Sequence, residues 1–215
     1  MTATRGNRPR LLIATRSEHK LRELRELLQL PADVVVSLQD LGIDGDPEET
    51  GTTFETNAAI KARFGVRESG LVTLADDSGL EVDALGGRPG VRTRRYAGPD
   101  ATDSENNAKL LAELRGVAPE LRTGRYVCAL ALALPTGIGP RGGIALMFSR
   151  GSLRGRIATT PRGTGGFGYD PIFEPWSEPP GGRTLGEWPA HDKNKISHRA
   201  NAARGMRRHL RSFLV

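Results

Sequence analysis

Two adjacent carboxylates follow an apolar run in the segment Ala75-Asp76-Asp77-Ser78-Gly79. The run from Leu71 to Ala75 is typical of a buried strand, and the Ser-Gly pair is typical of a turn. The segment therefore predicts two acidic side chains at the end of a buried strand, from which a carboxylate can hold a divalent metal or activate a water. Two negative charges in such a place are costly without a positive partner, so we expect a cation to bind there.

The rest of the chain has the pattern of an α/β protein. The expected strands cover residues 10–15, 34–38, 71–75, 80–82, 125–134 and 143–149, and residues 151–157 are expected to continue the sheet. The expected helices cover residues 18–28, 52–64, 102–114 and 197–214, and residues 163–170 and 174–192 are expected to be loops rich in glycine and proline. A strand and a helix followed by hairpin-like strands indicate a mixed sheet.

The composition indicates a globular protein in a reducing compartment. The chain has 215 residues, of which 37% are hydrophobic, enough for one sizeable domain or two closely packed lobes. Without a run of about 18 apolar residues, no membrane span is expected. Cys128 is the only cysteine, which excludes an intrachain disulfide and a cysteine-based metal cluster. We therefore expect a cytoplasmic protein, with residues 1–9 as a basic tail that lacks the apolar core of a signal peptide.

Few of the basic residues are lysines. The net charge is +6, and a basic protein can bind nucleic acid, membranes or small polyanions. Five lysines stand against 26 arginines, and Lys20, Lys61 and Lys193 lie in polar segments, where a compact point charge is useful. Lys20 ends the turn that starts at Thr15 and enters a predicted helix. A helix N-terminus is a natural phosphate site, although an ordinary strand-to-helix turn has the same pattern.

The segment Gly163–Gly168 has the spacing G-x-G-x-x-G, but it is not a dinucleotide fingerprint. A helix should follow such a fingerprint, and Tyr169-Asp170-Pro171 prevents a clean helix start. The sequence also lacks the G-x-x-x-x-G-K-[ST] pattern of P-loop proteins. A flexible backbone remains, with the ring of Phe167 available for stacking on a base and Asp170 as an acceptor; the alternative is a plain glycine turn.

Two further segments carry charges suited to a nucleotide. Lys193 to Arg199 combines lysine, serine, histidine and arginine at a helix start, and these donors suit a phosphate or a carbonyl on a base. The loop from Asp40 to Glu49 ends in Glu48 and Glu49. If it closes over Asp77, it supplies a second carboxylate for Mg²⁺, which prefers one or two carboxylates plus substrate phosphates; the alternative is an acidic surface loop. Together these segments indicate chemistry on a nucleotide polyphosphate.

Eight segments occur in an order that resembles the inosine/xanthosine triphosphate pyrophosphatases, a HAM1-type family. The segments are Ala14 to Lys20, Glu48-Glu49-Thr50-Gly51, Asn57-Ala58 with Lys61-Ala62, Ala75 to Leu80, Gly86-Gly87 with Pro89-Gly90, Arg95-Tyr96, Gly163 to Pro171, and Lys193 with Ser197-His198-Arg199. The resemblance covers residues 11–208. It implies Mg²⁺-dependent hydrolysis of ITP, dITP and XTP to the monophosphate and pyrophosphate, which keeps these nucleotides out of DNA and RNA.

The same resemblance implies a fold and a set of site residues. The implied fold is an elongated mixed β-sheet with flanking helices, with two lobes around a central cleft in one domain over residues 10–215, usually as a homodimer. Asp77 matches the catalytic carboxylate and metal ligand, and Glu48 matches the second metal-binding acid, with Glu49 as the alternative. The residues implied to bind substrate are Thr15, Arg16, Ser17, Glu18, His19, Lys20, Asn57, Lys61, Ser78, Phe167, Gly168, Tyr169, Asp170, Lys193, His198 and Arg199.

The chain departs from the family pattern at its first turn. The family usually has T-G-N-x-G-K, whereas this chain has Thr15-Arg16-Ser17-Glu18-His19-Lys20. Two glycines and the asparagine are replaced, so the contact of the asparagine falls to Ser17 or is lost. Thr56 also stands where a glutamate often precedes the asparagine that matches Asn57.

The expected mechanism follows from these roles. Lys20, Lys61 and Mg²⁺ neutralise the triphosphate while Asp77 orients or deprotonates a water that attacks the α-phosphorus. Phe167 stacks on the purine, and His198 and Arg199 donate to its 6-oxo group. One alternative is a Maf-type pyrophosphatase that acts on other modified nucleotides. A second is a non-enzymatic nucleic-acid-binding protein, which the isoelectric point of about 10.0 favours and the scarcity of aromatic residues disfavours.

Overall fold

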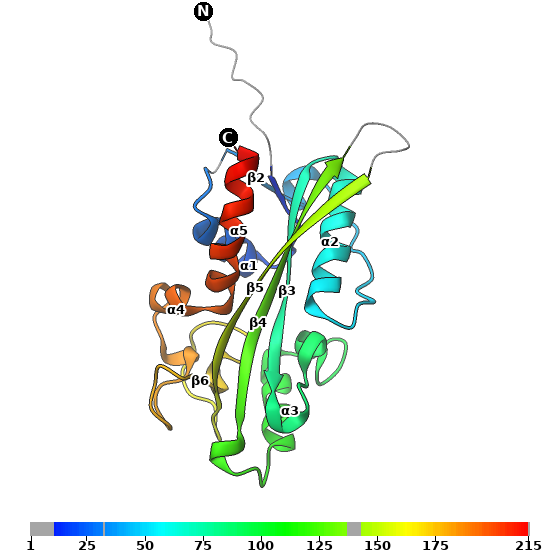
Figure 1. Cartoon of the computed structure of the whole chain (residues 1–215). Coiled ribbons are helices and arrows are strands. Elements are labelled where there is room, and N and C mark those ends of the chain that lie inside the picture. Colours follow the sequence, from blue (N-terminus) through cyan, green and yellow to red (C-terminus); the bar gives the residue numbers. More distant parts are fainter. Residues whose placement is uncertain (1–10, 32, 137–142, 215) are drawn as a thin grey trace, which may run out of the picture. The chain divides into compact units, whose positions relative to one another are not determined.

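A computed structural model describes residues 11–31, 33–136 and 143–214, with side chains to residue 211. The expected basic tail at residues 1–9 lies outside the described residues. Six strands form one sheet in the order β2-β1-β3-β4-β5-β6 (Figure 1). They are β1 (Leu11–Ile13), β2 (Val35–Ser37), β3 (Val72–Val82), β4 (Thr123–Thr136), β5 (Gly143–Ile157) and β6 (Phe173–Pro175). The α-helices are α1 (Glu18–Leu28), α2 (Phe54–Ser69), α3 (Asp103–Glu113), α4 (Ala190–Ile196) and α5 (His198–Leu214).

The sheet is mixed, as expected from the sequence. Strand β1 pairs in parallel with β2 and with β3, whereas β5 and β6 are antiparallel. Helix α1 connects β1 to β2, and α2 precedes β3, which gives the strand–helix alternation that parallel pairing requires. No helix within the described residues is both long enough and apolar enough to cross a membrane.

The chain divides into two compact units. Unit 1 comprises residues 1–77, 129–150 and 202–215, and unit 2 comprises residues 78–128 and 151–201. In unit 1, α2 lies on one side of the strands, and α1 with the later part of α5 lies on the other (Figure 1). Helix α2 approaches β1 and β3 closely at Gly65, because a Cβ there would meet Thr73 and Leu12. In unit 2 the core consists of Leu80, Val82, Tyr96, Leu110, Leu114, Tyr126, Ile157, Tyr169, Ile172, Phe173 and Leu185.

Local sequence signals explain where the helices begin. Ser17 caps α1 by accepting from the backbone of Lys20, and Thr53 and Thr102 form capping boxes at the starts of α2 and α3. Ser197, expected to cap the last helix, accepts a hydrogen bond from the backbone of Ala200. Such caps satisfy amide groups that have no partner within the helix.

Three expectations about the elements were wrong. Strand β3 runs without a break from Val72 to Val82, so the carboxylates lie in the middle of a strand and the Ser-Gly pair is not a turn. The backbone amide of Leu80 is satisfied by Thr93 Oγ1 at 2.8 Å, which holds the strand extended after Gly79. Helix α2 continues to Ser69, five residues beyond the expected end. Helix α4 begins at Ala190, after Pro189, within the expected loop at 174–192, because proline is compatible with a helix start.

Candidate functional site

The two carboxylates of β3 have separate partners. Asp77 Oδ1 lies 3.1 Å from Lys61 Nζ, and Asp77 Oδ2 accepts from Asn57 Nδ2 at 3.3 Å. Asp76 Oδ2 lies 3.0 Å from Lys20 Nζ. Successive side chains of a strand point to opposite faces, so Asp77 meets α2 and Asp76 meets α1. The sequence led us to expect a bound cation at this pair, and the structure shows that each carboxylate has a lysine of the chain itself as a positive partner.

Helix α2 links Asp77 to the acidic loop. Asn57 and Lys61 are four residues apart and therefore lie on the same face of α2. Asn57 Oδ1 accepts from the backbone amide of Gly51 at 2.8 Å, and Lys61 Nζ also lies 3.3 Å from Glu49 Oε1. The loop thus brings Glu49 to the same ammonium group as Asp77. Glu48 is exposed, and its side chain makes no hydrogen bond or ion pair with the described residues.

The electrostatics of this cluster show an excess of negative charge. Burial raises the pKa of Asp77 above its usual value, against the lowering effect of Lys61 and Lys20. Burial also acts to lower the pKa of Lys61, but Asp77, Asp76 and Glu49 together raise it. Three carboxylates therefore surround two ammonium groups, and a further cation is favoured here.

The donor set fits Mg²⁺. Carboxylate oxygens are its preferred protein ligands, and it usually combines one or two of them with substrate phosphates. Asp77 and Glu49 already share a cation, the Lys61 ammonium, so their oxygens are close enough together to serve one positive centre. Among the described residues, no group of three His, Cys, Asp or Glu side chains is arranged to hold a metal by itself.

The side chains of the turn before α1 form hydrogen bonds with other residues of the chain. Thr15 Oγ1 accepts from the backbone of Ser17 at 3.3 Å, and Ser17 is the helix cap. Glu18 and His19 are exposed, and His19 Nδ1 lies 3.0 Å from Arg22. Arg16 binds the acidic loop, with its Nε 2.9 Å from Asp46 Oδ2. Lys20, on Asp76, is the residue of this turn that joins the carboxylate cluster.

A second cluster, in unit 2, is centred on Asp170. Asp170 Oδ2 lies 2.7 Å from Lys193 Nζ and accepts from the backbone of Phe167 at 3.0 Å. Asp170 Oδ1 accepts from the Tyr126 hydroxyl at 3.3 Å. Tyr126 stacks on His198, with ring centroids 4.8 Å apart and planes within 9°. Burial keeps the pKa of Tyr126 well above its usual value, and Asp170 adds to this, so the hydroxyl stays protonated and can donate.

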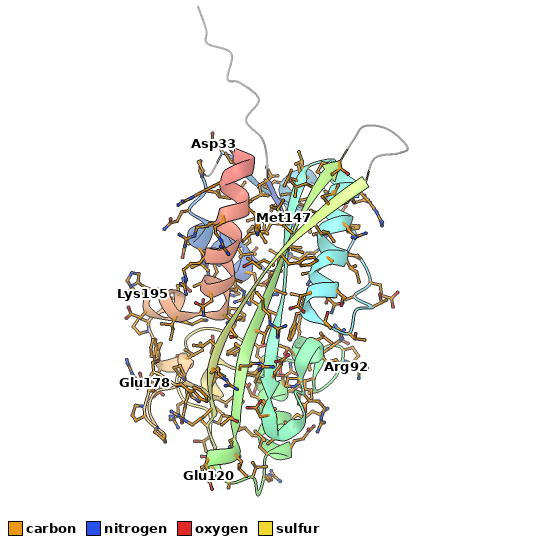
Figure 2. All side chains as sticks on the ribbon, in the orientation of Figure 1. Asp33, Arg92, Glu120, Met147, Glu178 and Lys195 are labelled. Carbon is orange, nitrogen blue, oxygen red and sulfur yellow. The ribbon has the colours of Figure 1, made fainter. Side chains whose placement is uncertain are left out.

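The ring of Phe167 lies beside cations in the same cluster. Lys193 Nζ is 4.9 Å and the Arg199 guanidinium carbon is 5.2 Å from its centroid. Arg199 also donates to Ser78 Oγ at 3.0 Å. Lys193 is only 6% exposed, whereas Lys195, two residues further along α4, points outward (Figure 2). Of the two lysines on α4, Lys193 is thus the one placed in the cluster.

The backbone around Gly168 is held by α3. Asp103 Oδ2 accepts from the Gly168 amide at 2.6 Å, and Asn107 Nδ2 donates to the Gly168 carbonyl at 3.1 Å. Gly166 has φ +75°, and a Cβ there would meet the Asp170 carboxylate, so only glycine fits. Tyr169 is anchored by its hydroxyl on the Thr93 carbonyl at 2.9 Å. The backbone from Gly166 to Asp170 is therefore held in place by these hydrogen bonds.

The structure brings together most residues that the sequence indicated, and it adds three. Asp77, Glu49, Asn57, Lys61 and Lys20 meet in unit 1; Ser78, Phe167 to Asp170, Lys193, His198 and Arg199 meet in unit 2. Tyr126, Asp103 and Asn107 escaped the sequence analysis. Tyr126 begins the apolar part of β4, and its polar neighbour Arg125 pairs with Glu81 instead of with the cluster. Asn107 could have been noticed from the sequence. Asn106 and Asn107 share a helix face with the buried Leu110, and polar side chains on a buried face need hydrogen-bond partners.

Comparison with known proteins identifies the family. The Ham1 family model matches residues 11–209. A dITP/XTP pyrophosphatase of Bacillus licheniformis is 46% identical over 192 residues, covering 89% of this chain and 93% of that protein. One of Geobacter sulfurreducens is 46% identical over 201 residues, covering 94% and 96%. The structure of a HAM1 protein from Coxiella burnetii has a TM-score of 0.82 and 38% identity, covering 95% of this chain and 99% of that chain. The chain belongs to the Ham1 family.

Proposed function

We propose that this chain is a nucleoside triphosphate pyrophosphatase that hydrolyses dITP, ITP and XTP to the monophosphate and pyrophosphate, with Mg²⁺. The observation that carries the proposal is the position of Asp77, buried in the middle of β3 between Lys61 and Asn57. Two relatives of the chain, each 46% identical to it, are named dITP/XTP pyrophosphatases. The reaction removes non-canonical purines from the nucleotide pool.

Asp77 acts on the attacking water. Lys61 and Asn57 fix both oxygens of its carboxylate, and each oxygen has a lone pair left to accept a hydrogen bond from water. Burial raises the pKa of Asp77, which makes the carboxylate a stronger base towards that water. The proton of the water moves to Asp77 as the oxygen attacks the α-phosphorus.

The lysines bind the phosphates. Lys61 and Lys20 are 16% and 20% exposed in their side chains, so each can offer a donor to a phosphate oxygen while it keeps a carboxylate partner. Asp77 and Glu49, with Glu48 one residue away, would hold Mg²⁺, which would supply positive charge to stabilise the leaving pyrophosphate. The amide groups at the start of α1 add to this field.

The cluster around Asp170 selects the base. Phe167 offers a ring face for stacking, and Arg199, His198 and Lys193 are donors for a 6-oxo group. Adenine has an amino group in that place and leaves such donors unpaired, at a cost of about 1–3 kcal/mol each. Ser78 of β3 accepts from Arg199 at 3.0 Å, which adds a polar contact to this donor set.

The proposal also covers the oligomeric state and the location of the protein. The chain forms a homodimer, which light scattering on the purified protein tests. We also include a cytoplasmic location, which a buried free thiol at Cys128 supports because reducing compartments keep thiols free.

The test is a panel of nucleotides with identification of the products. With Mg²⁺, dITP, ITP and XTP are expected to give the monophosphate and pyrophosphate with a kcat/KM about a hundredfold above that for dATP. A panel member with a methylated pyrimidine base tests the Maf-type alternative. Release of a diphosphate and free phosphate, or equal turnover of the pyrimidine, would overturn the proposal.

A further inference from the structure

The guanidinium of Arg16 holds the acidic loop at three points. Arg16 Nε lies 2.9 Å from Asp46 Oδ2, and the same NH₂ group donates to the Ile43 carbonyl at 2.8 Å and to the Gly45 carbonyl at 2.7 Å. Arg16 is 27 to 30 residues away from these acceptors in sequence. The contacts therefore tie the turn before α1 to a separate loop of unit 1.

Apart from this anchor, the exposed part of the loop has few polar contacts with the described residues. Its backbone is irregular from Ile43 to Gly51, and residues 44–46 are exposed. In the described part of the chain, Arg16 is the only side chain that donates a hydrogen bond to residues 43–46. The next anchor along the loop is Glu49, which reaches Lys61. An exposed ion pair alone contributes little, but two carbonyl acceptors fix the backbone as well as the side chain.

The residue type at position 16 is suited to this task. A guanidinium presents its N–H groups in a rigid planar fork that can serve three acceptors at once.

We propose that Arg16 is a positioning residue that holds the acidic loop so that Glu49 stays beside Lys61 and Asp77. This inference rests on the proposed function for the role of Glu49 as a metal ligand. Arg16 acts through the loop and not on the substrate, because its guanidinium is directed at Ile43, Gly45 and Asp46. Loss of the tether lets the loop open and removes one carboxylate from the place where the metal binds.

The test compares Arg16→Met with Arg25→Met. Methionine keeps the length of the side chain and removes the donors. Arg25 is the matched control, since it pairs with Asp40 at 3.5 Å near the start of the same loop. Amide hydrogen exchange is measured on the protein without metal or nucleotide, in peptides from residues 40–53 and from α1. Exchange reports local opening directly, so this readout does not depend on the proposed activity.

The expected result is specific to one region and one kinetic constant. In Arg16→Met, the hydrogen-bonded amides of Ile43, Thr50 and Gly51 exchange about tenfold faster. The Mg²⁺ concentration for half-maximal dITP hydrolysis rises about tenfold, while the KM for dITP at saturating Mg²⁺ stays within about twofold. In Arg25→Met neither quantity changes. A raised KM with unchanged loop exchange would show a substrate contact and overturn the inference, as would no change in loop exchange.

A second variant covers the case in which Arg16→Met also loosens α1. Asp46→Asn leaves Arg16 in place and weakens one of the three contacts, at an exposed position of the loop. Loop exchange is expected to rise in this variant by about threefold with α1 unchanged, and wild-type exchange would contradict the tether. If the wild-type protein does not hydrolyse dITP, the proposed function fails, and the exchange data still decide whether Arg16 holds the loop.

Discussion

Lys61 Nζ lies 3.1 Å from Asp77 Oδ1 and 3.3 Å from Glu49 Oε1, so one ammonium group holds two carboxylates that come from different parts of the chain. Asp77 belongs to β3 and Glu49 to the acidic loop, while Lys61 belongs to α2. The side chains of Lys61 and Asp77 are 16% and 10% exposed, so water screens their attraction only partly. Lys61 therefore stabilises the arrangement of acids that the proposed reaction uses.

Replacement of this ammonium should destabilise the protein in a way that a metal can correct. Lys61→Met leaves Asp77 and Glu49 without their shared cation, and the free energy of unfolding is expected to fall by about 2 kcal/mol, after allowance for partial exposure of the pair. Added Mg²⁺ is expected to raise the melting temperature of this variant more than that of the wild type, because it restores positive charge.

Urea unfolding with and without Mg²⁺ measures both effects. Lys61→Arg is the control, since it keeps the charge and should stay within about 1 kcal/mol of the wild type. Equal stability of Lys61→Met and wild type would mean that the pair does not hold the cluster together.

Asn57 is expected to support both the loop and Asp77, the carboxylate that we propose to be catalytic. It is fully buried, and its amide accepts from Gly51 and donates to Asp77. Asn57→Leu removes both bonds and should cost about 2–3 kcal/mol of stability. Asn57→Asp keeps an acceptor for Gly51 but sets a second negative charge beside Asp77, so it should lower kcat more than stability. Denaturant titration and steady-state kinetics on both variants check this; a Leu variant as stable as the wild type contradicts the assigned role.

Tyr126 is expected to control discrimination between bases through His198 and Asp170. Tyr126→Phe keeps the ring on His198 and loses the hydroxyl bond to Asp170, at about 0.5–1.5 kcal/mol. Tyr126→Leu loses the ring and lets His198 move, so the ratio of kcat/KM for dITP over dATP should fall by about tenfold, while the Phe variant keeps it within about threefold. Identical ratios in the Leu and Phe variants would exclude a positioning role for the ring.

Much of the fold and part of the site could be predicted from local patterns. The caps at Ser17, Thr53 and Thr102 mark helix starts because they satisfy local amides. The placement of Asp76 and Asp77 on opposite faces follows from strand alternation. The continuity of β3 could not be predicted, because the amide that keeps it extended is satisfied by Thr93, which is distant in sequence. Arg16 and Tyr126 were missed as positioning residues for the same reason: their acceptors and stacking partners come from remote segments.

The most direct test of the account is the release of pyrophosphate from dITP by Asp77→Asn, measured beside Asp83→Asn. Asp83, which accepts from Thr123 at the surface, controls for the loss of one acidic charge on the same protein. We predict that Asp77→Asn folds, keeps the two clusters and loses about a thousandfold in kcat, whereas Asp83→Asn stays near the wild type. Turnover near the wild-type rate in a folded Asp77→Asn protein would contradict the central claim that this carboxylate performs the reaction.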